Sequence, residues 1–314
     1  MEDTGYLDFI INRLKGITYK EKILLCEAVN NESEIINKSK SDIELIIGRR
    51  LEKKPDIESS RKRAENDVEK ALKQNIKWVC FRDSDYPPLL REIYDPPIML
   101  FYIGKLPNPK LPLVAIVGTR KPSPKAAAQA YDIAKGLGQN GISVVSGLAL
   151  GIDSMAHKGN IQGILECEKV LSDNQIPRAA SVAVLGSGLD HIYPSSNRNL
   201  ARQILETGGA LISEYTCGVG PRKWTFPARN RIISGISRGV LIVEAPKKSG
   251  ALITAGFALE QNREVWVSSA GSIAETDGRD SFYDRRGTIK LAEEGAVIVN
   301  SEFDILKEWK INKE

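Results

Sequence analysis

LVAIVGTRKPSPKAAAQAYDIAKGLGQNGISVVS, residues 113–146, contains a short apolar run, a helical segment and a second apolar run in succession. Ser123 and Pro124 supply an N-cap and a first-turn proline for the helical segment, which we expect to end near Gly141. Apolar runs joined by connections of a dozen or more residues are typical of parallel strands linked by right-handed helical crossovers. This stretch therefore predicts a strand–helix–strand unit.

The same alternation continues along the rest of the chain. Five more apolar runs rich in strand-forming residues follow, at 181–186, 209–213, 239–245, 263–267 and 295–299, and helical stretches fill most of the gaps. Strands that are almost continuously apolar are buried on both faces, as in a parallel sheet covered by helices. The pattern predicts an α/β fold with a doubly wound, mostly parallel sheet.

Two different segments precede the predicted sheet. Residues 1–77 predict a small helical N-terminal domain, because apolar residues from Leu7 to Leu14 recur at helical spacing. Acids and bases alternate from residue 39 to 77, which favours a solvated helix face over a direct DNA contact. Residues 78–112 contain two Pro-Pro pairs, and we expect them to form a strand and turn connector that joins the core.

The composition, with 42% hydrophobic and 27% charged residues, is that of an ordinary globular protein. The net charge of +4 does not by itself indicate a nucleic-acid-binding protein, so a basic surface has to come from local clustering. The four cysteines lie far apart, and the two histidines offer few candidates for metal ligands or a catalytic base. Because of these few candidates, we expect neither a metal nor a cofactor. We find neither a signal peptide nor an apolar stretch of roughly 20 residues, which favours a soluble cytoplasmic protein with no membrane partner.

Glycines and small polar residues follow the predicted strands at their carboxyl ends, where ligands bind in an open α/β sheet. Glycine lets a phosphate approach the backbone, free N–H groups at a helix start favour an anion, and Arg120 adds a forked cation. For any one loop, a glycine that only permits a tight turn is the better explanation, but four such loops at one edge favour a phosphate-binding rim. The rim residues are Gly118, Thr119, Arg120, Ser146, Gly147, Gly186, Lys248, Ser249, Gly250 and Thr254.

Residues 221–238, with the sequence PRKWTFPARNRIISGISR, combine basic and aromatic side chains. Trp224 and Phe226 interleave with the basic residues, and we expect Pro227 to stiffen a loop. Basic residues that follow a nucleic-acid backbone, with aromatic faces on which bases stack, are the ingredients of a single-strand binding site. Five basic residues and no acid lie between Tyr215 and Val243: Arg222, Lys223, Arg229, Arg231 and Arg238.

A structural explanation of this segment stays open beside the functional one. In it, the two aromatic rings are buried, and Arg229 and Arg231 pair with Glu214 or Glu244. Arg231 is the residue that we most expect to have such a structural role, because arginines are seldom buried without a partner.

Six blocks of the sequence identify a family that the chain resembles. They are VAIVGTRKPSP, SGLALGIDSMAH, AVLGSGLDHIYPSSNRNL, LISEY, FPARNRIISGIS and VLIVEAPKKSGALITAGFALEQNREV. In this order they resemble the DNA-processing protein A family, also called DprA or Smf, over about residues 78–299. The resemblance implies a Rossmann-like DNA-binding domain over residues 113–314 and a homodimer. It also implies a protein without enzymatic activity that binds single-stranded DNA, protects incoming DNA and loads the RecA recombinase in natural transformation.

The resemblance also assigns roles to residues. It implies that Arg120 grips a phosphate and that Phe226 stacks on a base, with Lys223, Arg229 and Asn230 beside it. It further implies phosphate contacts from the rim, by Ser146, Gly147, Gly186, Ser249, Gly250 and Thr254.

The sequence departs from the family pattern in four places. The stretch between His157 and Ser181 is longer, so we expect an insertion near the rim. Residues 268–272 read SSAGS where the family turns through Val-Pro-Gly, and Ile289 stands where an asparagine is usual. The chain ends soon after Trp309, so we expect no C-terminal winged helix.

An enzyme is the alternative that the residues leave open. A similar sheet with a Gly-Thr loop occurs in the nucleotide phosphoribohydrolases of the lonely-guy type, whose PGGxGTxxE block needs a carboxylate three residues after the threonine. Here Phe257 stands in that position after Thr254, and Glu260 is too far along to replace it. The standard GxGxxG and GxxxxGK[ST] nucleotide motifs are also missing. Glu244 and Asp153 are the remaining acid/base candidates, although caps of loops are the better explanation for both.

Overall fold

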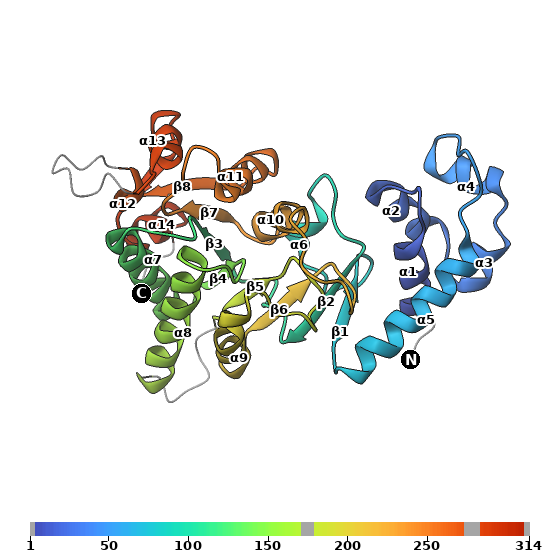
Figure 1. The fold of residues 1–314 in the computed structure, drawn as a ribbon, viewed down its shortest axis with the longest axis horizontal. Helices are drawn as coiled ribbons and strands as arrows, with labels where there is room; N and C mark the ends of the chain where they lie inside the picture. Colours follow the sequence, from blue (N-terminus) through green and yellow to red (C-terminus); the bar gives the residue numbers. More distant parts are fainter. Residues whose placement is uncertain (1–3, 171–178, 273–282, 311–314) are drawn as a thin grey trace.

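A computed structural model describes residues 4–170, 179–272 and 283–310 (Figure 1). Within these residues one sheet has the strand order β1-β2-β6-β5-β4-β3-β7-β8-β9. Its strands are β1 Lys77–Cys80, β2 Met99–Gly104, β3 Leu113–Val117, β4 Ser143–Ser146, β5 Val182–Val184, β6 Ala210–Ser213, β7 Gly239–Ile242, β8 Glu264–Ser268 and β9 Val297–Val299. Each of the seven strands predicted from Leu113 onward is present.

The seven strands from β3 to β9 are parallel to one another. From β3 the chain moves through β4 and β5 to β6, then crosses to β7 on the other side of β3 and continues through β8 to β9. This reversal at β3 makes the sheet doubly wound, as predicted. The helix after β3 has the predicted cap, since the Ser123 hydroxyl accepts a hydrogen bond from the main-chain N–H of Ala126.

Helices cover both faces of the parallel strands, and successive residues of β3 show why. Val114 and Ile116 pack against the helices on one face, while Ala115 and Val117 pack against those on the other. The first face carries α7 (Pro124–Gln139), α8 (Ile152–Val170) and α14 (Glu302–Glu308), and the second carries α10 (Thr225–Gly235) and α11 (Gly250–Glu260). The remaining helices of this part are η1 Ser195–Asn197, α9 Arg198–Glu206, α12 Ser269–Ser272 and α13 Arg286–Glu293.

The segment 78–112 contributes strands to the same sheet. β1 pairs with β2, and β2 pairs with β6, both in antiparallel orientation. The short helix α6 (Pro88–Arg91) lies between them in the sequence. The segment thus contains two strands, which extend the sheet at its β6 side, and a helix that the sequence did not predict.

The N-terminal residues form five helices, which lie beyond β1 at one end of the molecule (Figure 1). The Phe9 ring packs edge-on against Trp78 of β1 and Phe101 of β2, with centroids 5.1 Å and 5.7 Å away. Charged side chains on α5 pair with one another in solvent, as Arg61 does with Glu65. The alternating charges are thus a solvated helix face, as predicted. The helices are α1 Thr4–Arg13, α2 Tyr19–Ala28, α3 Glu32–Asn37, α4 Lys40–Ile47 and α5 Ile57–Lys73.

Candidate nucleic-acid interface

A small pocket of about 50 Å³ opens at the carboxyl edge of the sheet. It collects residues from the loops after β3, β4 and β5 and from the start of α10. We call it the rim pocket, and its lining residues are Arg120, Gly147, Ala149, Leu150, Tyr193, Pro194, Phe226 and Arg229. This lining includes two arginines and, among the described residues, no carboxylate.

Arg120 and Phe226 face each other in the rim pocket. The guanidinium carbon of Arg120 lies 5.9 Å from the centroid of the Phe226 ring. Arg120 is exposed and Phe226 is half-buried, so both side chains reach solvent. The predicted shared groove for a cation and an aromatic ring is therefore present in the geometry.

The expected loop around Phe226 is largely a helix, which corrects the sequence prediction. α10 begins at Thr225, whose hydroxyl donates to the carbonyl oxygen of Arg222 at 2.8 Å and so closes the turn before the helix. Pro227 is the third helical residue, where a missing N–H costs no hydrogen bond because the first four N–H groups of a helix have no partner within it. The sequence did not distinguish the two cases, because a proline in the first turn of a helix and a proline in a loop have the same local sequence signal.

Arg229 lies below the rim pocket and is only 5% exposed. Its guanidinium donates to the carbonyl oxygens of Gly147, at 2.8 Å, and of Val184. Burial lowers the pKa of Arg229 to about 10. The residue expected to contact DNA is thus an anchor that fixes α10 to the ends of β4 and β5. It pairs with neither Glu214 nor Glu244 in the described structure.

Gly147 and Gly186 are needed for packing around this anchor. A Cβ atom on Gly147 would lie 2.6 Å from the Arg229 guanidinium, and one on Gly186 would lie 3.0 Å from the Phe226 ring. Both glycines are buried. Their small size therefore lets α10 approach the sheet, which explains them without a phosphate.

Three polar members of the predicted site are buried and already bonded. The hydroxyl of Ser146 donates to the carbonyl oxygen of Ile116 at 2.6 Å. The carbonyl oxygen of Gly250 accepts from the Thr254 hydroxyl at 3.2 Å and from the Asn230 amide at 3.1 Å. These buried side chains hold the rim together, and the structure gives them a supporting role.

The other members of the predicted rim are accessible. Lys223, Lys248 and Gly250 are exposed. Ser249 is half-buried and caps α11, since its hydroxyl accepts from the N–H of Leu252 at 3.4 Å. Gly118 and Thr119 are half-buried beside Arg120. The predicted residues thus divide into an accessible set around Arg120 and a buried set that supports it.

Aromatic rings border the pocket, and the sequence prediction missed one of them. The Tyr193 ring centroid lies 5.4 Å from that of Phe226, with the ring planes tilted by 42°. Trp224, which was predicted, is 58% exposed. The available signal for Tyr193 was an aromatic residue soon after the β5 loop, in the quoted block AVLGSGLDHIYPSSNRNL.

Arg231 has the structural role that we expected for it. Its guanidinium pairs with Glu214 at 2.7 Å and with Asp95 at 2.9 Å, and the side chain is 4% exposed. Burial acts to lower the pKa of Arg231, but the Glu214 carboxylate more than offsets this, so the pKa lies above its usual value. The second half of α10 is therefore fastened to the sheet by buried charges.

The two carboxylates considered as an acid/base pair each cap a different loop. Glu244 is 1% exposed and accepts from the N–H of Ser123 at 3.0 Å and from its hydroxyl at 2.6 Å. Asp153 accepts from the N–H groups of Gly147 and Ala149, and burial raises its pKa. Both carboxylates are therefore used in holding loops, and neither lines the rim pocket.

No observation favours the nucleotide phosphoribohydrolase alternative. Thr254 is buried in its bond to Gly250, while Glu260 is exposed at the end of α11. Over the described ranges we find no group of His, Cys, Asp and Glu residues that could hold a metal ion. A search of the same ranges gives no helix long and apolar enough to cross a membrane.

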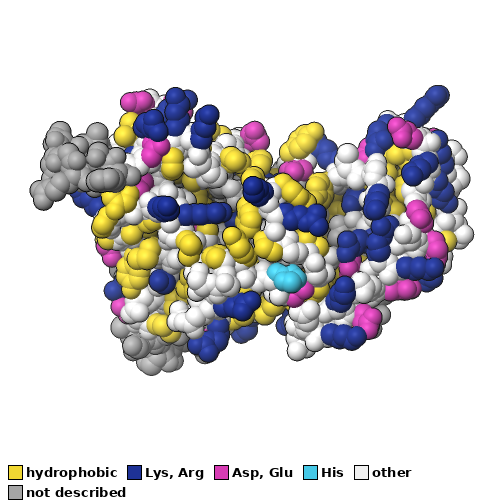
Figure 2. Space-filling view, viewed as in Figure 1, with side chains coloured by type: hydrophobic (Ala, Val, Ile, Leu, Met, Phe, Trp, Pro, Cys, Tyr) yellow, Lys and Arg dark blue, Asp and Glu magenta, His cyan; other side chains and the backbone are white. Residues whose placement is uncertain are grey.

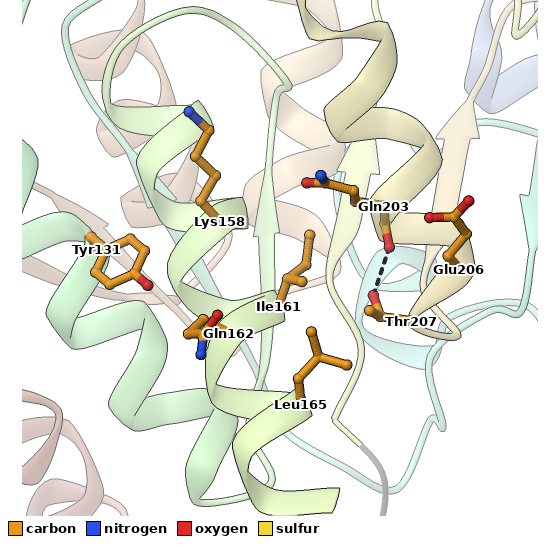
Figure 3. A pocket seen from close by; sticks show the side chains of 8 residues that line it. All are labelled: Tyr131, Lys158, Ile161, Gln162, Leu165, Gln203, Glu206 and Thr207. Carbon is orange, nitrogen blue, oxygen red and sulfur yellow. Dashed lines mark hydrogen bonds between the residues drawn. The ribbon is translucent and has the colours of Figure 1, made fainter.

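A second pocket, of about 580 Å³, lies between α7, α8 and α9 (Figure 3). Tyr131 comes from α7, and Lys158 and Leu165 come from α8. Glu206 of α9 adds a carboxylate to the lining. This mixed lining contains no arginine and no residue that the sequence pointed to, so it is a poor match for a phosphate backbone.

Three departures from the family pattern fall wholly or partly on described residues. The longer stretch between His157 and Ser181 continues α8 to Val170, and residues 171–178 of the expected insertion lie outside the described residues. Residues 269–272 form α12. The hydroxyl of Thr288, just before Ile289, donates to the carbonyl oxygen of Gly271 at 2.5 Å.

Comparison with known proteins agrees with the geometry. A family model described as DNA recombination-mediator protein A matches residues 77–310. The DNA processing protein DprA of Streptococcus pneumoniae is 40% identical over 228 residues, which are 73% of this chain and 72% of that protein. Protein Smf of Synechocystis is 40% identical over 244 residues, 76% of this chain. The match spans about half, 55%, of the Synechocystis protein.

Two solved structures share the fold. The X-ray structure of DNA processing protein A from Streptococcus pneumoniae superposes with a TM-score of 0.73 at 33% identity, covering 98% of this chain and 99% of that one. A structure of DNA processing protein A from Helicobacter pylori, described as concerning its single-stranded DNA binding mode, gives a TM-score of 0.59 at 26% identity. It covers 76% of this chain and 98% of the other.

Proposed function

The chain belongs to the DNA recombination-mediator protein A family, and on that premise we propose that it binds single-stranded DNA across the rim pocket as a non-enzymatic recombination mediator. In this proposal Arg120 holds a phosphate, Phe226 stacks on a base, and the exposed Lys223 and Lys248 contact the backbone.

The observation that carries this proposal is the approach of the Arg120 guanidinium to the Phe226 ring at a solvent-accessible edge. A forked cation suits phosphate oxygens, and a ring beside it suits a base of the same strand. Stacking on an aromatic ring contributes about 1–3 kcal/mol per base whichever base it is, so the site need not read sequence. In a duplex the bases are already stacked on one another, which favours the single strand as ligand.

Accessible basic side chains support the same ligand. Lys223 and Lys248 are exposed, and Figure 2 shows basic and hydrophobic side chains interspersed over the middle of one face of the molecule. The N-terminal end of the α10 dipole adds partial positive charge beside Phe226. The Helicobacter pylori relative is described as binding single-stranded DNA, and it shares the fold at 26% identity.

Fluorescence anisotropy with a labelled oligothymidine and a duplex of equal length tests the proposal. We expect preference for the single strand at both about 50 mM and about 200 mM salt. Arg120→Ala should weaken binding equally for different sequences and make the salt slope shallower by about 0.7, the value for one lost phosphate contact on a single strand. Arg202→Ala is the matched control, since Arg202 is an exposed arginine on α9.

Unchanged affinity in Arg120→Ala, or equal binding of the duplex and the single strand, would contradict the proposal. An equal loss in Arg202→Ala would show that only overall charge matters.

The family resemblance also supports a dimeric protein that acts in the cytoplasm and loads RecA on the bound strand. We expect the wild type to shorten the lag of RecA-dependent ATP hydrolysis on DNA coated with single-strand-binding protein, and Arg120→Ala to lose this effect. Sedimentation equilibrium tests the dimer separately.

A further inference from the structure

We propose that Tyr193 is a second base-stacking residue beside Phe226, so that two successive bases of the strand bind at the rim pocket. This inference rests on the proposed function and assigns the ligand of a side chain that the family resemblance did not single out.

The spacing of the two rings determines how bases can bind. A base stacks at roughly 3.4 Å from an aromatic plane, the spacing of bases along a strand, so a base held between two rings needs them roughly 7 Å apart. The Tyr193 and Phe226 centroids are 5.4 Å apart and the rings are tilted by 42°. A base sandwiched between the two rings does not fit, so the two rings have to stack on different bases.

Tyr193 is exposed in a way that a structural tyrosine is not. Its side chain is 46% exposed, and the structure shows no hydrogen bond from its hydroxyl to a described residue. Tyr86 has the opposite character, since it is fully buried and its hydroxyl donates to the carbonyl oxygen of Pro97 at 2.6 Å. An exposed ring with an unused hydroxyl next to a cation is suited to a nucleotide.

The loop that carries Tyr193 is held on both sides. The hydroxyl of Ser187 donates to the carbonyl oxygen of His191 at 2.7 Å. The Asn197 amide donates to the carbonyl oxygens of Leu148 at 2.8 Å and of Ala149 at 3.2 Å. Binding therefore orders little additional backbone, because the ring is already presented at the pocket.

The neighbourhood suits bases more than a charged partner. Leu150, on the loop that Asn197 fastens, is 47% exposed and lines the same pocket. With Tyr193 and Phe226 it gives an apolar strip, and Arg120 stands beside this strip for the phosphates. Tyr94 is an exposed tyrosine that can be compared with Tyr193. It is 77% exposed, but it does not line the rim pocket, and its ring contacts the Lys20 ammonium.

An abasic scan tests the inference on the full chain. The ligand is the shortest oligothymidine that keeps full affinity, because a short strand fixes the register, with one abasic position moved along it. We expect the wild type to lose affinity at two adjacent positions. Phe226→Ala should abolish the penalty at one of them and Tyr193→Ala the penalty at the other.

The affinities of the variants give a second readout. Tyr193→Ala should weaken binding of the intact strand by roughly 5- to 150-fold, the range for one stacking ring, and Tyr193→Phe should stay within about threefold of wild type. The double variant should lose the product of the two single losses. Tyr94→Ala is the control, and thermal melting checks that each variant folds.

Two results separate the possible failures. If the double variant binds no more weakly than Phe226→Ala, Tyr193 only supports Phe226 and the inference is wrong. If Phe226→Ala and Arg120→Ala also leave the affinity unchanged, the proposed function itself fails.

Discussion

The segment 221–238 uses its basic residues differently in two parts, which meet where α10 begins at Thr225. In the part before α10, Arg222 and Lys223 are exposed, as is Trp224. In the part within α10, Arg229 and Arg231 are buried and bonded to carbonyl oxygens and carboxylates. The start of α10 separates accessible cations from those that hold the helix in place.

This difference shows that a count of basic residues along a sequence does not give the number of cations accessible to a ligand. An arginine is buried only where acceptors are available for its N–H groups, and the ends of β4 and β5 supply them to Arg229. The accessible positive charge of the segment is therefore smaller than its sequence suggests. Substitutions within α10 at buried arginines should consequently change the free energy of unfolding, and substitutions before α10 should change DNA affinity.

The largest effect should come from Arg229→Met. This change leaves the Gly147 and Val184 carbonyl oxygens unpaired and removes the positive charge that stabilises the buried Asp153 carboxylate. We expect the free energy of unfolding to fall by about 3–5 kcal/mol, because the buried Asp153 charge then lacks the compensating charge of Arg229. Urea denaturation measures it, and Arg222→Met, in the exposed part before α10, should stay within about 0.5 kcal/mol of wild type.

Two results would contradict this assignment of Arg229 to the fold and of Arg222 to the accessible surface. One is a loss of stability in Arg222→Met alone, and the other is a loss of DNA affinity in Arg229→Met without any loss of stability.

His157 lies close enough to Arg229 to feel its charge, and the pH dependence of stability tests this buried environment. Burial, and then the nearby Arg229 charge, lower the pKa of His157 from 6.5 to about 3. The unfolded state therefore binds one more proton than the folded state between these values, so stability is lost as the pH falls from about 6.5 to about 3. In His157→Asn this slope, at most about 1.4 kcal/mol per pH unit, should flatten in urea titrations. An identical slope in both proteins would contradict the shift.

Phe226→Ala should affect binding and have less influence on folding. We expect the affinity for single-stranded DNA to fall by about 1–3 kcal/mol, because one stacking face is lost. Phe303→Ala on α14 is the control, since its ring is 59% exposed on another helix. Equal affinities of the two variants in anisotropy titrations would show that Phe226 is not a base-stacking residue.

The smallest effect should come from Lys223→Ala. An exposed lysine that contacts one phosphate contributes mainly through counterion release, so the salt slope should fall by about 0.7 while stability is unchanged. Lys158→Ala, in the pocket of Figure 3, should leave the slope as it is. A lower slope in Lys158→Ala would instead direct attention to that second pocket.

The sequence predicted the strands, their doubly wound order and the capped helix at Ser123, because burial on both faces and helix capping leave local signals. It also predicted that Arg120 and Phe226 lie together at the carboxyl edge of the sheet. It did not separate Arg229 from Lys223, since burial depends on acceptors supplied by β4 and β5, far away in the chain. Tyr193 was missed for a related reason: its contact with Phe226 joins a loop to the start of α10, 33 positions apart (193 to 226), and only the fold brings them together.

Photo-crosslinking tests the central claim most directly. A single strand carrying 5-iodouracil is bound to the protein and irradiated, and the crosslinked peptides are identified by mass spectrometry. The account predicts adducts on Phe226 or Tyr193, and their loss in Arg120→Ala at protein concentrations near the wild-type Kd. Adducts confined to the N-terminal helices or to the pocket between α7, α8 and α9 would contradict it.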